Sequence, residues 1–213
     1  MCYSKNISIY SFTTSIITNL FLIYYANNAQ INEEYAINLK IVGYGMMFVG
    51  FMQLFDYIFW TNQIEKKTNF VTTKLAMIFN HLQPIVFLTL FLLLKGTIGK
   101  WSSIIIGVYS MFAIIYTYNA WKKTNYTLVT DQSRPGLFWE WNYQPYATYF
   151  YTLFLLSLTV LFWENMNYPL NLIGILISNL TFFYSLIKYN NKGDIGRMWC
   201  YFASLSSLLF LIK

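Results

Sequence analysis

Seven apolar runs divide the chain at similar intervals, at approximately residues 8–26, 41–60, 70–94, 101–121, 144–163, 168–187 and 196–212. A helix needs about 20 apolar residues to cross the hydrocarbon core of a membrane, and every run except the short last one approaches that length. Polar turn segments such as "TNQIEKKTN" and "NNKGD" separate the runs. The pattern predicts an all-α integral membrane bundle of about seven transmembrane helices that forms a single domain over residues 1–213.

The composition supports a lipid environment. Hydrophobic residues make up 57% of the chain and charged residues only 10%, whereas a soluble domain carries about 25% charged residues. The net charge of +6 is not a nucleic-acid signal, because the Lys and Arg residues lie in short segments between the apolar runs. The predicted partner is therefore the lipid bilayer and not a nucleic acid.

The basic residues also predict an orientation. If the seven runs alternate in direction, ten of the 14 Lys and Arg residues lie on the amino-terminal side. Cytoplasmic loops are enriched in Lys and Arg, so we expect a cytoplasmic amino terminus and a carboxyl terminus outside. The ten residues are Lys5, Lys66, Lys67, Lys74, Lys122, Lys123, Arg134, Lys188, Lys192 and Arg197; the other four are Lys40, Lys95, Lys100 and Lys213.

Tryptophans near the ends of the runs predict aromatic belts at the two membrane interfaces. They are Trp60, Trp101, Trp121, Trp139, Trp141 and Trp163. The stretch "SRPGLFWEWNYQP", residues 133–145, is consistent with an interfacial loop anchored by its aromatic residues. The alternative is a re-entrant segment that caps the cytoplasmic mouth of the bundle.

Small residues at helical spacing predict close helix contacts. Gly43 and Gly50 are seven residues apart in the second run and so lie on one helix face. The sequence is compatible with either a monomer or a homo-oligomer.

The third run carries hydrogen-bonding groups in the segment "IFNHLQPIVF". On a helix, with Asn80 at zero, Pro84 lies at about 40°, His81 at about 100° and Gln83 at about −60°. Pro84 also leaves the carbonyl of Asn80 without its usual helical donor. Because polar groups cannot face lipid cheaply, we expect this face to point into the bundle, with the imidazole and the amides directed toward one another.

The second run offers a partner face, since Gln53 and Asp56 are three residues apart. Asp56 lies near the cytoplasmic end, where it could also reach Lys66. Together with the third run, these residues predict a polar ladder with His81 at its inner end. Further members are Asn119, Asn179, Glu140 and the hydroxyls of Tyr143, Tyr146 and Tyr149.

Three functions are open. The leading one is a channel or transporter-like pathway for a proton, ion or small solute. His81 would be its central group, Asp56 its cytoplasmic charge, and the rest of its lining Asn80, Gln83, Pro84, Gln53, Glu140 and Asn119. The second is a non-catalytic scaffold or receptor-like protein in which the same groups only fasten helices. The third is a membrane enzyme that uses Cys2 or His81.

Several chemistries are excluded. A single histidine leaves too few ligands for a zinc hydrolase. The final run has no lysine before Lys213 that could hold retinal, and no glycine-rich phosphate loop or Ser–His–Asp pattern is present. No cofactor and no metal is predicted.

Three segments resemble the motifs of a protein family: the opening "MCYS", then "MQLFDYIFW", then "TNFVTTKLAMIFNHLQPIVF". The chain resembles an uncharacterised family of small polytopic membrane proteins from bacteria, algae and large DNA viruses, over about the first ninety residues. The chain departs from the family pattern at Tyr3, where Trp is usual, and at Met52, where Glu is frequent. The resemblance implies no particular activity, but it implies motif positions at Cys2, Ser4, Gln53, Asn69, His81, Gln83 and Pro84.

Overall fold

The computed structural model describes residues 4–63, 67–129, 137–189 and 192–211; of Tyr189, residues 192–195 and Arg197 it describes only the backbone. The described part of the chain is all-α, as predicted. It contains seven α-helices and two short 3₁₀ helices. The bounds are α1 Lys5–Asn28, α2 Glu33–Thr61, α3 Lys67–Lys95, α4 Lys100–Lys123, η1 Glu140–Tyr143, α5 Ala147–Asn165, α6 Leu170–Tyr189, α7 Lys192–Leu205 and η2 Ser207–Leu211.

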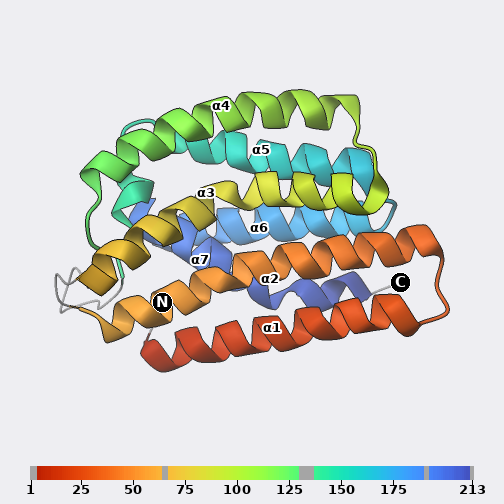
Figure 1. Ribbon diagram of the computed structural model, residues 1–213, viewed down its shortest axis with the longest axis horizontal. Helices are drawn as coiled ribbons and strands as arrows, with labels where there is room; N and C mark the ends of the chain where they lie inside the picture. The colour runs from red at the N-terminus through yellow and green to blue at the C-terminus, as the bar shows by residue number, and fades with distance from the viewer. Residues whose placement is uncertain (1–3, 64–66, 130–136, 190–191, 212–213) are drawn as a thin grey trace.

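Six helices in these described ranges, α1 to α6, are long and apolar enough to cross a membrane. The chain is therefore a multi-pass integral membrane protein. The six helices lie side by side along the long axis of the molecule (Figure 1). The start of α1 and the carboxyl termini of α2, α4 and α6 lie at one end of the bundle, here called the Lys5 end (Figure 1). The opposite end, where α3 finishes at Lys95, is called the Lys95 end.

The seventh run forms a shorter helix than expected. α7 has 14 residues, and the chain continues as η2 instead of as one long helix. Hydroxyls cluster at the break: Ser204 Oγ donates to the carbonyl of Tyr201 and Ser206 Oγ to that of Ala203. Such side-chain bonds compete with helical backbone bonds. η2 nevertheless reaches the start of α2, where the Tyr35 hydroxyl donates to the carbonyl of Phe210 at 3.2 Å.

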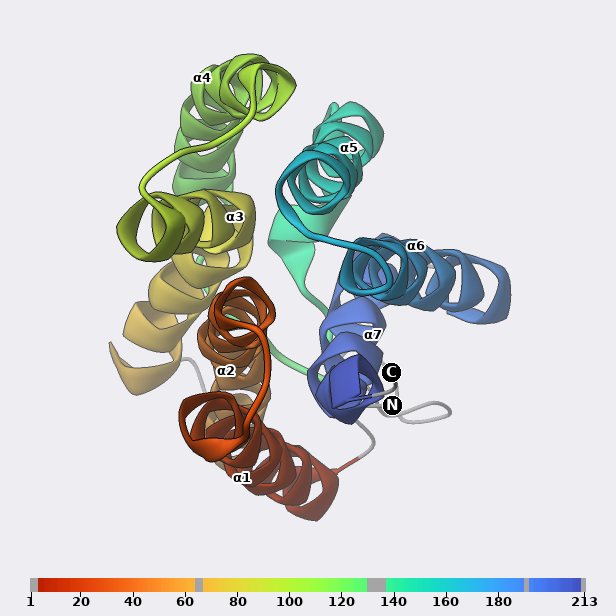
Figure 2. The same cartoon turned by 90° about the vertical axis from the view of Figure 1, so that its right-hand side faces the viewer.

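Seen along the bundle, the helices form a ring in chain order, and α7 completes it (Figure 2). α7 contacts α6 on one side and α1 and α2 on the other. Residues 137–143, which precede α5, lie inside this ring, where η1 contacts α4 and α7 (Figure 2). The interior of the bundle is therefore built from α2, α3, α4, α5, α7 and these residues.

α1 and α2 pack closely through the predicted small residues. A Cβ atom on Gly50 would lie 2.5 Å from Ser15 Oγ, and one on Gly43 would lie 2.6 Å from Ile23 Cγ1. A larger residue at either position would have to displace a side chain of α1, so the predicted close contact at the two glycines is confirmed.

α5 begins at Ala147, three residues later than its apolar run. Tyr146 has a positive φ of 67°, in the left-handed region, so a right-handed helix cannot extend backwards through it. At its other end α5 supports α4. The Glu164 carboxylate accepts from Ser102 N at 2.7 Å and Trp101 N at 3.2 Å, the free donors of the first turn of α4.

Candidate functional site

α3 changes direction near its middle, where Pro84 lies inside the helix (Figure 1). A proline within a helix removes a backbone bond and bends the helix. The Tyr109 hydroxyl of α4 donates to the carbonyl of His81 at 2.6 Å. The carbonyl that accepts a hydrogen bond from a neighbouring helix is therefore that of His81 and not that of Asn80, the carbonyl that lacks its helical donor because of Pro84.

The His81 ring lies between α3, α4 and α5 and is only 2% exposed. Its Nδ1 is 2.7 Å from Thr117 Oγ1, and its ring centroid lies 4.7 Å from that of Phe150 and 5.4 Å from that of Tyr116. Its Nε2 is buried without a hydrogen-bond partner among the described residues. One nitrogen of the imidazole therefore retains unused bonding capacity in an aromatic surrounding.

Asn80 and Gln83 face a different neighbour. Both side-chain amides donate to the sulfur of Cys200 in α7, at 3.6 Å from Asn80 Nδ2 and 3.7 Å from Gln83 Nε2. All three residues are fully buried, and Gln83 Oε1 has no partner in the described part of the chain. The expectation that the imidazole and the amides point toward one another is therefore wrong, because the ring turns to α4 and α5 and the amides turn to α7.

Tyr151 of α5 joins the two halves. Its hydroxyl donates to Asn80 Oδ1 at 2.7 Å and also contacts Asn142 Oδ1, and a single hydroxyl proton serves one of these oxygens at a time. Its ring centroid lies 6.5 Å from that of His81. We refer to the resulting set as the interior polar cluster: Asn80, His81, Gln83, Asn142, Tyr151 and Cys200.

Gln53 and Asp56 of α2 are both fully buried. Asp56 Oδ1 accepts a hydrogen bond from the indole Nε1 of Trp139 at 3.0 Å. Lys66, the alternative partner of Asp56 expected from the sequence, lies outside the described residues. The carboxylate is thus directed into the protein, toward the connection between α4 and α5.

That connection enters the bundle through residues 137–143, here called the inserted segment. Trp139 and Trp141 are fully buried and stack with ring centroids 5.0 Å apart, and the Tyr116 hydroxyl donates to the carbonyl of Trp141 at 2.6 Å. The belt prediction is wrong for these two tryptophans, because Asp56 and Tyr116 bind the segment inside the ring. Trp101 and Trp163, 66% and 68% exposed, are placed as belt residues would be.

A buried lysine connects α3 to the carboxyl end of α4 near the Lys5 end of the bundle. Lys74 of α3 donates to the carbonyls of Trp121 and Thr124 at the carboxyl end of α4, where a cation is favoured by the helix dipole. Glu140 of the inserted segment is half-buried. Burial raises the pKa of its carboxyl group, and the charge of Lys74 partly opposes that rise.

Several residues expected in the ladder lie outside the interior. Asn119 is exposed, and so are Tyr143, Tyr146 and Tyr149, at 60% or more. Asn179 is half-buried and donates to Thr159 on the outer side of α5. The tyrosines that do supply interior hydroxyls are Tyr109, Tyr116 and Tyr151, which face inward because of how α4 and α5 are rotated.

Two other residues at the motif positions, Ser4 and Asn69, make hydrogen bonds that stabilise their local backbone. Ser4 caps α1, accepting from the backbone of Ile7. Asn69 ties two loops together with four hydrogen bonds: it donates to Asn62 O and Thr127 O and accepts from Thr127 N and Thr73 Oγ1. Cys2 lies outside the described residues, so nothing is shown of the thiol in the enzyme hypothesis.

Cys200, Asn142 and Tyr151 could not be predicted from the sequence as interior polar residues, since each lies in an ordinary aromatic or small-residue context. Among the described residues, no group of three or more His, Cys, Asp or Glu side chains could hold a metal ion. The donors and acceptors of the interior polar cluster are therefore amides, hydroxyls, a thiol and an imidazole.

No family profile, no curated protein and no solved structure matches this chain. The resemblance of its first ninety residues to a family of small polytopic membrane proteins stays a prediction.

Proposed function

We propose that this protein is a channel or transporter-like membrane protein whose interior polar cluster binds a small hydrogen-bonding solute or relays a proton. The observation that carries the proposal is the unused bonding capacity of the cluster. His81 Nε2, Gln83 Oε1 and Asn142 Nδ2 are buried and have no partner among the described residues. Buried polar atoms are nearly always paired with protein or with ordered water, so three such atoms in one cluster favour a bound polar species.

Asn69 provides the contrast. Its amide is equally buried, and both its oxygen and its nitrogen are paired with protein groups. Each buried donor or acceptor left unpaired costs about 1–3 kcal/mol, so a residue that fastens helices or loops is most stabilising when it is fully paired, as Asn69 is. The interior polar cluster does not follow this fastening pattern.

The chemistry of the cluster favours an uncharged species or a proton over other ions. A metal cation would need several oxygen ligands, but the amide nitrogens of Asn80 and Gln83 face the cluster's thiol, and the nearby carboxylate of Asp56 is bonded by Trp139. An anion would need a positive charge, and Lys74 is bonded to two backbone carbonyls. Amides, hydroxyls and an imidazole suit a neutral solute or a proton relay.

The bundle is occluded at the cluster in the described conformation. Trp139 bonds Asp56 close to the carboxyl end of α2, so the stacked pair of Trp139 and Trp141 lies toward the Lys5 end of the bundle. Toward the Lys95 end, buried aromatic rings follow, with Phe87 packed against Phe162 at 5.2 Å. Passage would require the inserted segment to move, and this movement would break the Trp139–Asp56 bond.

A scaffold remains the second candidate, and the fully paired contacts of Asn69, Lys74 and Glu164 favour it. In that case the interior polar cluster would contribute to stability alone, at about 0.6–2 kcal/mol for each hydrogen bond between helices.

The test compares two tyrosines of α5 in reconstituted liposomes. Tyr151→Phe removes only the hydroxyl that bonds Asn80 and contacts Asn142, and Tyr149→Phe removes a hydroxyl from a residue that is 71% exposed. Proton flux is read with a trapped pH dye under an imposed potential, and glycerol flux by light scattering. We expect Tyr151→Phe to reduce flux of at least one probe by about two- to tenfold, the effect of one hydrogen bond, and Tyr149→Phe to leave it unchanged.

A third variant opens the occluded end. Trp139→Phe deletes the indole N–H that bonds Asp56, so we expect flux to rise above that of the unaltered protein. If neither probe passes through the unaltered protein or through Trp139→Phe, while Tyr151→Phe lowers the melting temperature, the scaffold is correct and the pathway is rejected.

A further inference from the structure

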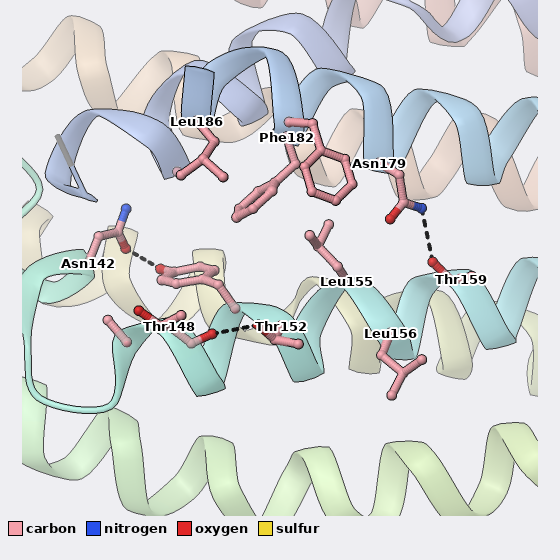
Figure 3. Close-up of a pocket in the computed structure, with 13 residues that line it drawn as sticks. Asn142, Thr148, Thr152, Leu155, Leu156, Thr159, Asn179, Phe182 and Leu186 are labelled. Atoms are coloured by element: carbon pink, nitrogen blue, oxygen red, sulfur yellow. Dashed lines mark hydrogen bonds between the residues drawn. The ribbon is translucent and has the colours of Figure 1, made fainter. Parts of the chain in front are cut away.

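A groove of about 460 Å³ lies between α5 and α6, on the outer side of the interior polar cluster. Its walls are mainly apolar, with Leu155 on α5 and Phe182 and Leu186 on α6 directed into it (Figure 3). Asn142 lies at one end, and the hydrogen-bonded pair Asn179 and Thr159 at the other (Figure 3). Both helices are long and apolar enough to span a membrane, so the groove opens toward lipid.

The length of the groove fits one leaflet. Thr148 and Thr159 both line it and are eleven residues apart on α5, which corresponds to about 16 Å along a helix. Half of the hydrocarbon core is about 15 Å thick. Because Thr148 lies in the first turn of α5 and Thr159 past its middle, the groove runs from the membrane boundary at the Lys5 end to about the midplane.

The head of the groove carries an unsatisfied donor. Asn142 is 1% exposed, and its Nδ2 has no hydrogen-bond partner among the described residues. It precedes α5 and so lies at the Lys5 end of the groove, and the ester carbonyl of a phospholipid supplies the acceptor oxygen that an amide N–H needs. Gly196 leaves room here, since a Cβ atom at that position would lie 2.3 Å from Asn142 Nδ2. Lys188, in the last turn of α6, supplies a positive charge at the same end of the bundle for a phosphate.

We infer that this groove is a binding site for one glycerophospholipid from the leaflet at the Lys5 end. One acyl chain lies between α5 and α6, and an ester carbonyl accepts from Asn142. This inference does not depend on the proposed function, although Asn142 and Tyr151 belong both to the groove lining and to the interior polar cluster. A lipid in this place would contact the hydrogen-bonded network from outside.

The test uses two exposed threonines with the same local geometry. Thr152 lines the groove and donates to the carbonyl of Thr148 at 2.8 Å, whereas Thr89 on α3 donates to that of Ile85 at 2.9 Å, away from the groove. Thr152→Trp fills the groove from its wall, and Thr89→Trp adds the same bulk elsewhere. Leu186→Trp is a second filling variant, from the α6 side. Native mass spectrometry in detergent counts the molecules retained after delipidation and addition of a phosphatidylglycerol or of oleic acid.

We expect the unaltered protein and Thr89→Trp to retain one phosphatidylglycerol that both filling variants lack, with all folded variants melting at the same temperature. Should one filling variant fail to fold, the other gives the answer. Equal retention by the filling variants and the unaltered protein would overturn the inference, as would retention of oleic acid alone. Neither result depends on flux, so this inference and the transport proposal fail separately.

Discussion

Asn69→Leu is expected to lower the melting temperature of the protein in detergent by about 6–12 °C. The substitution removes four hydrogen bonds and leaves the buried backbone carbonyl and N–H of Thr127 without their Asn69 partner, whereas Thr73 keeps its bond to Thr127 Oγ1. Each buried polar group left unpaired costs about 1–3 kcal/mol, so we expect a loss of about 3 kcal/mol or more. At this chain length, 1 kcal/mol corresponds to about 2–4 °C. Thermal unfolding followed by tryptophan fluorescence gives the result.

Asn28→Leu is the matched control. Asn28 is exposed, and its amide makes one bond, to the carbonyl of Tyr24 in the same helix. Surface substitutions of this kind change stability by about 0.5 kcal/mol or less, so its melting temperature should stay within about 2 °C of the unaltered protein. A similar small shift for Asn69→Leu would show that Asn69 does not hold the two loops together.

Gly45→Ala is expected to destabilise the protein by about 1–3 kcal/mol, the range for adding a methyl group to a packed core. The added Cβ would lie 2.2 Å from Phe87 Cε1 and 2.4 Å from Cζ. Phe87 cannot move aside freely, because it is 2% exposed and packs edge-on against Phe162 at 5.2 Å. Denaturant or thermal unfolding in a fixed detergent measures the loss.

Gly107→Ala is the control, because a Cβ atom there meets nothing within 4 Å. Gly107 lies inside α4, so alanine should stabilise the protein by about 0.5–1 kcal/mol through helix propensity. A second measurement isolates the cause: in a Phe87→Leu background the cost of Gly45→Ala should largely disappear, as a double-mutant cycle reports. An undiminished cost in that background would exclude the Phe87 contact as its origin.

The helices, and the burial of the polar residues near the middle of α3, could be predicted from the sequence alone. Apolar runs of spanning length predicted α1 to α6, because in lipid a backbone must satisfy its hydrogen bonds within each segment. Because polar side chains are costly in contact with acyl chains, the sequence also predicted that Asn80, His81 and Gln83 are buried, as they are. The two glycines of the α1–α2 contact also followed from spacing alone.

Which polar groups bond to one another depends on how the helices pack. Asn80 and His81 are neighbours in sequence, but the turn of about 100° between them directs one to Cys200 and the other to Thr117. Trp139 and Trp163 both lie beside apolar runs, yet one is buried and the other is 68% exposed. The difference comes from Asp56, more than eighty residues earlier in the chain, which bonds the indole of Trp139. Local pattern fixes how each segment behaves toward lipid, whereas the partners depend on how seven helices rotate against one another.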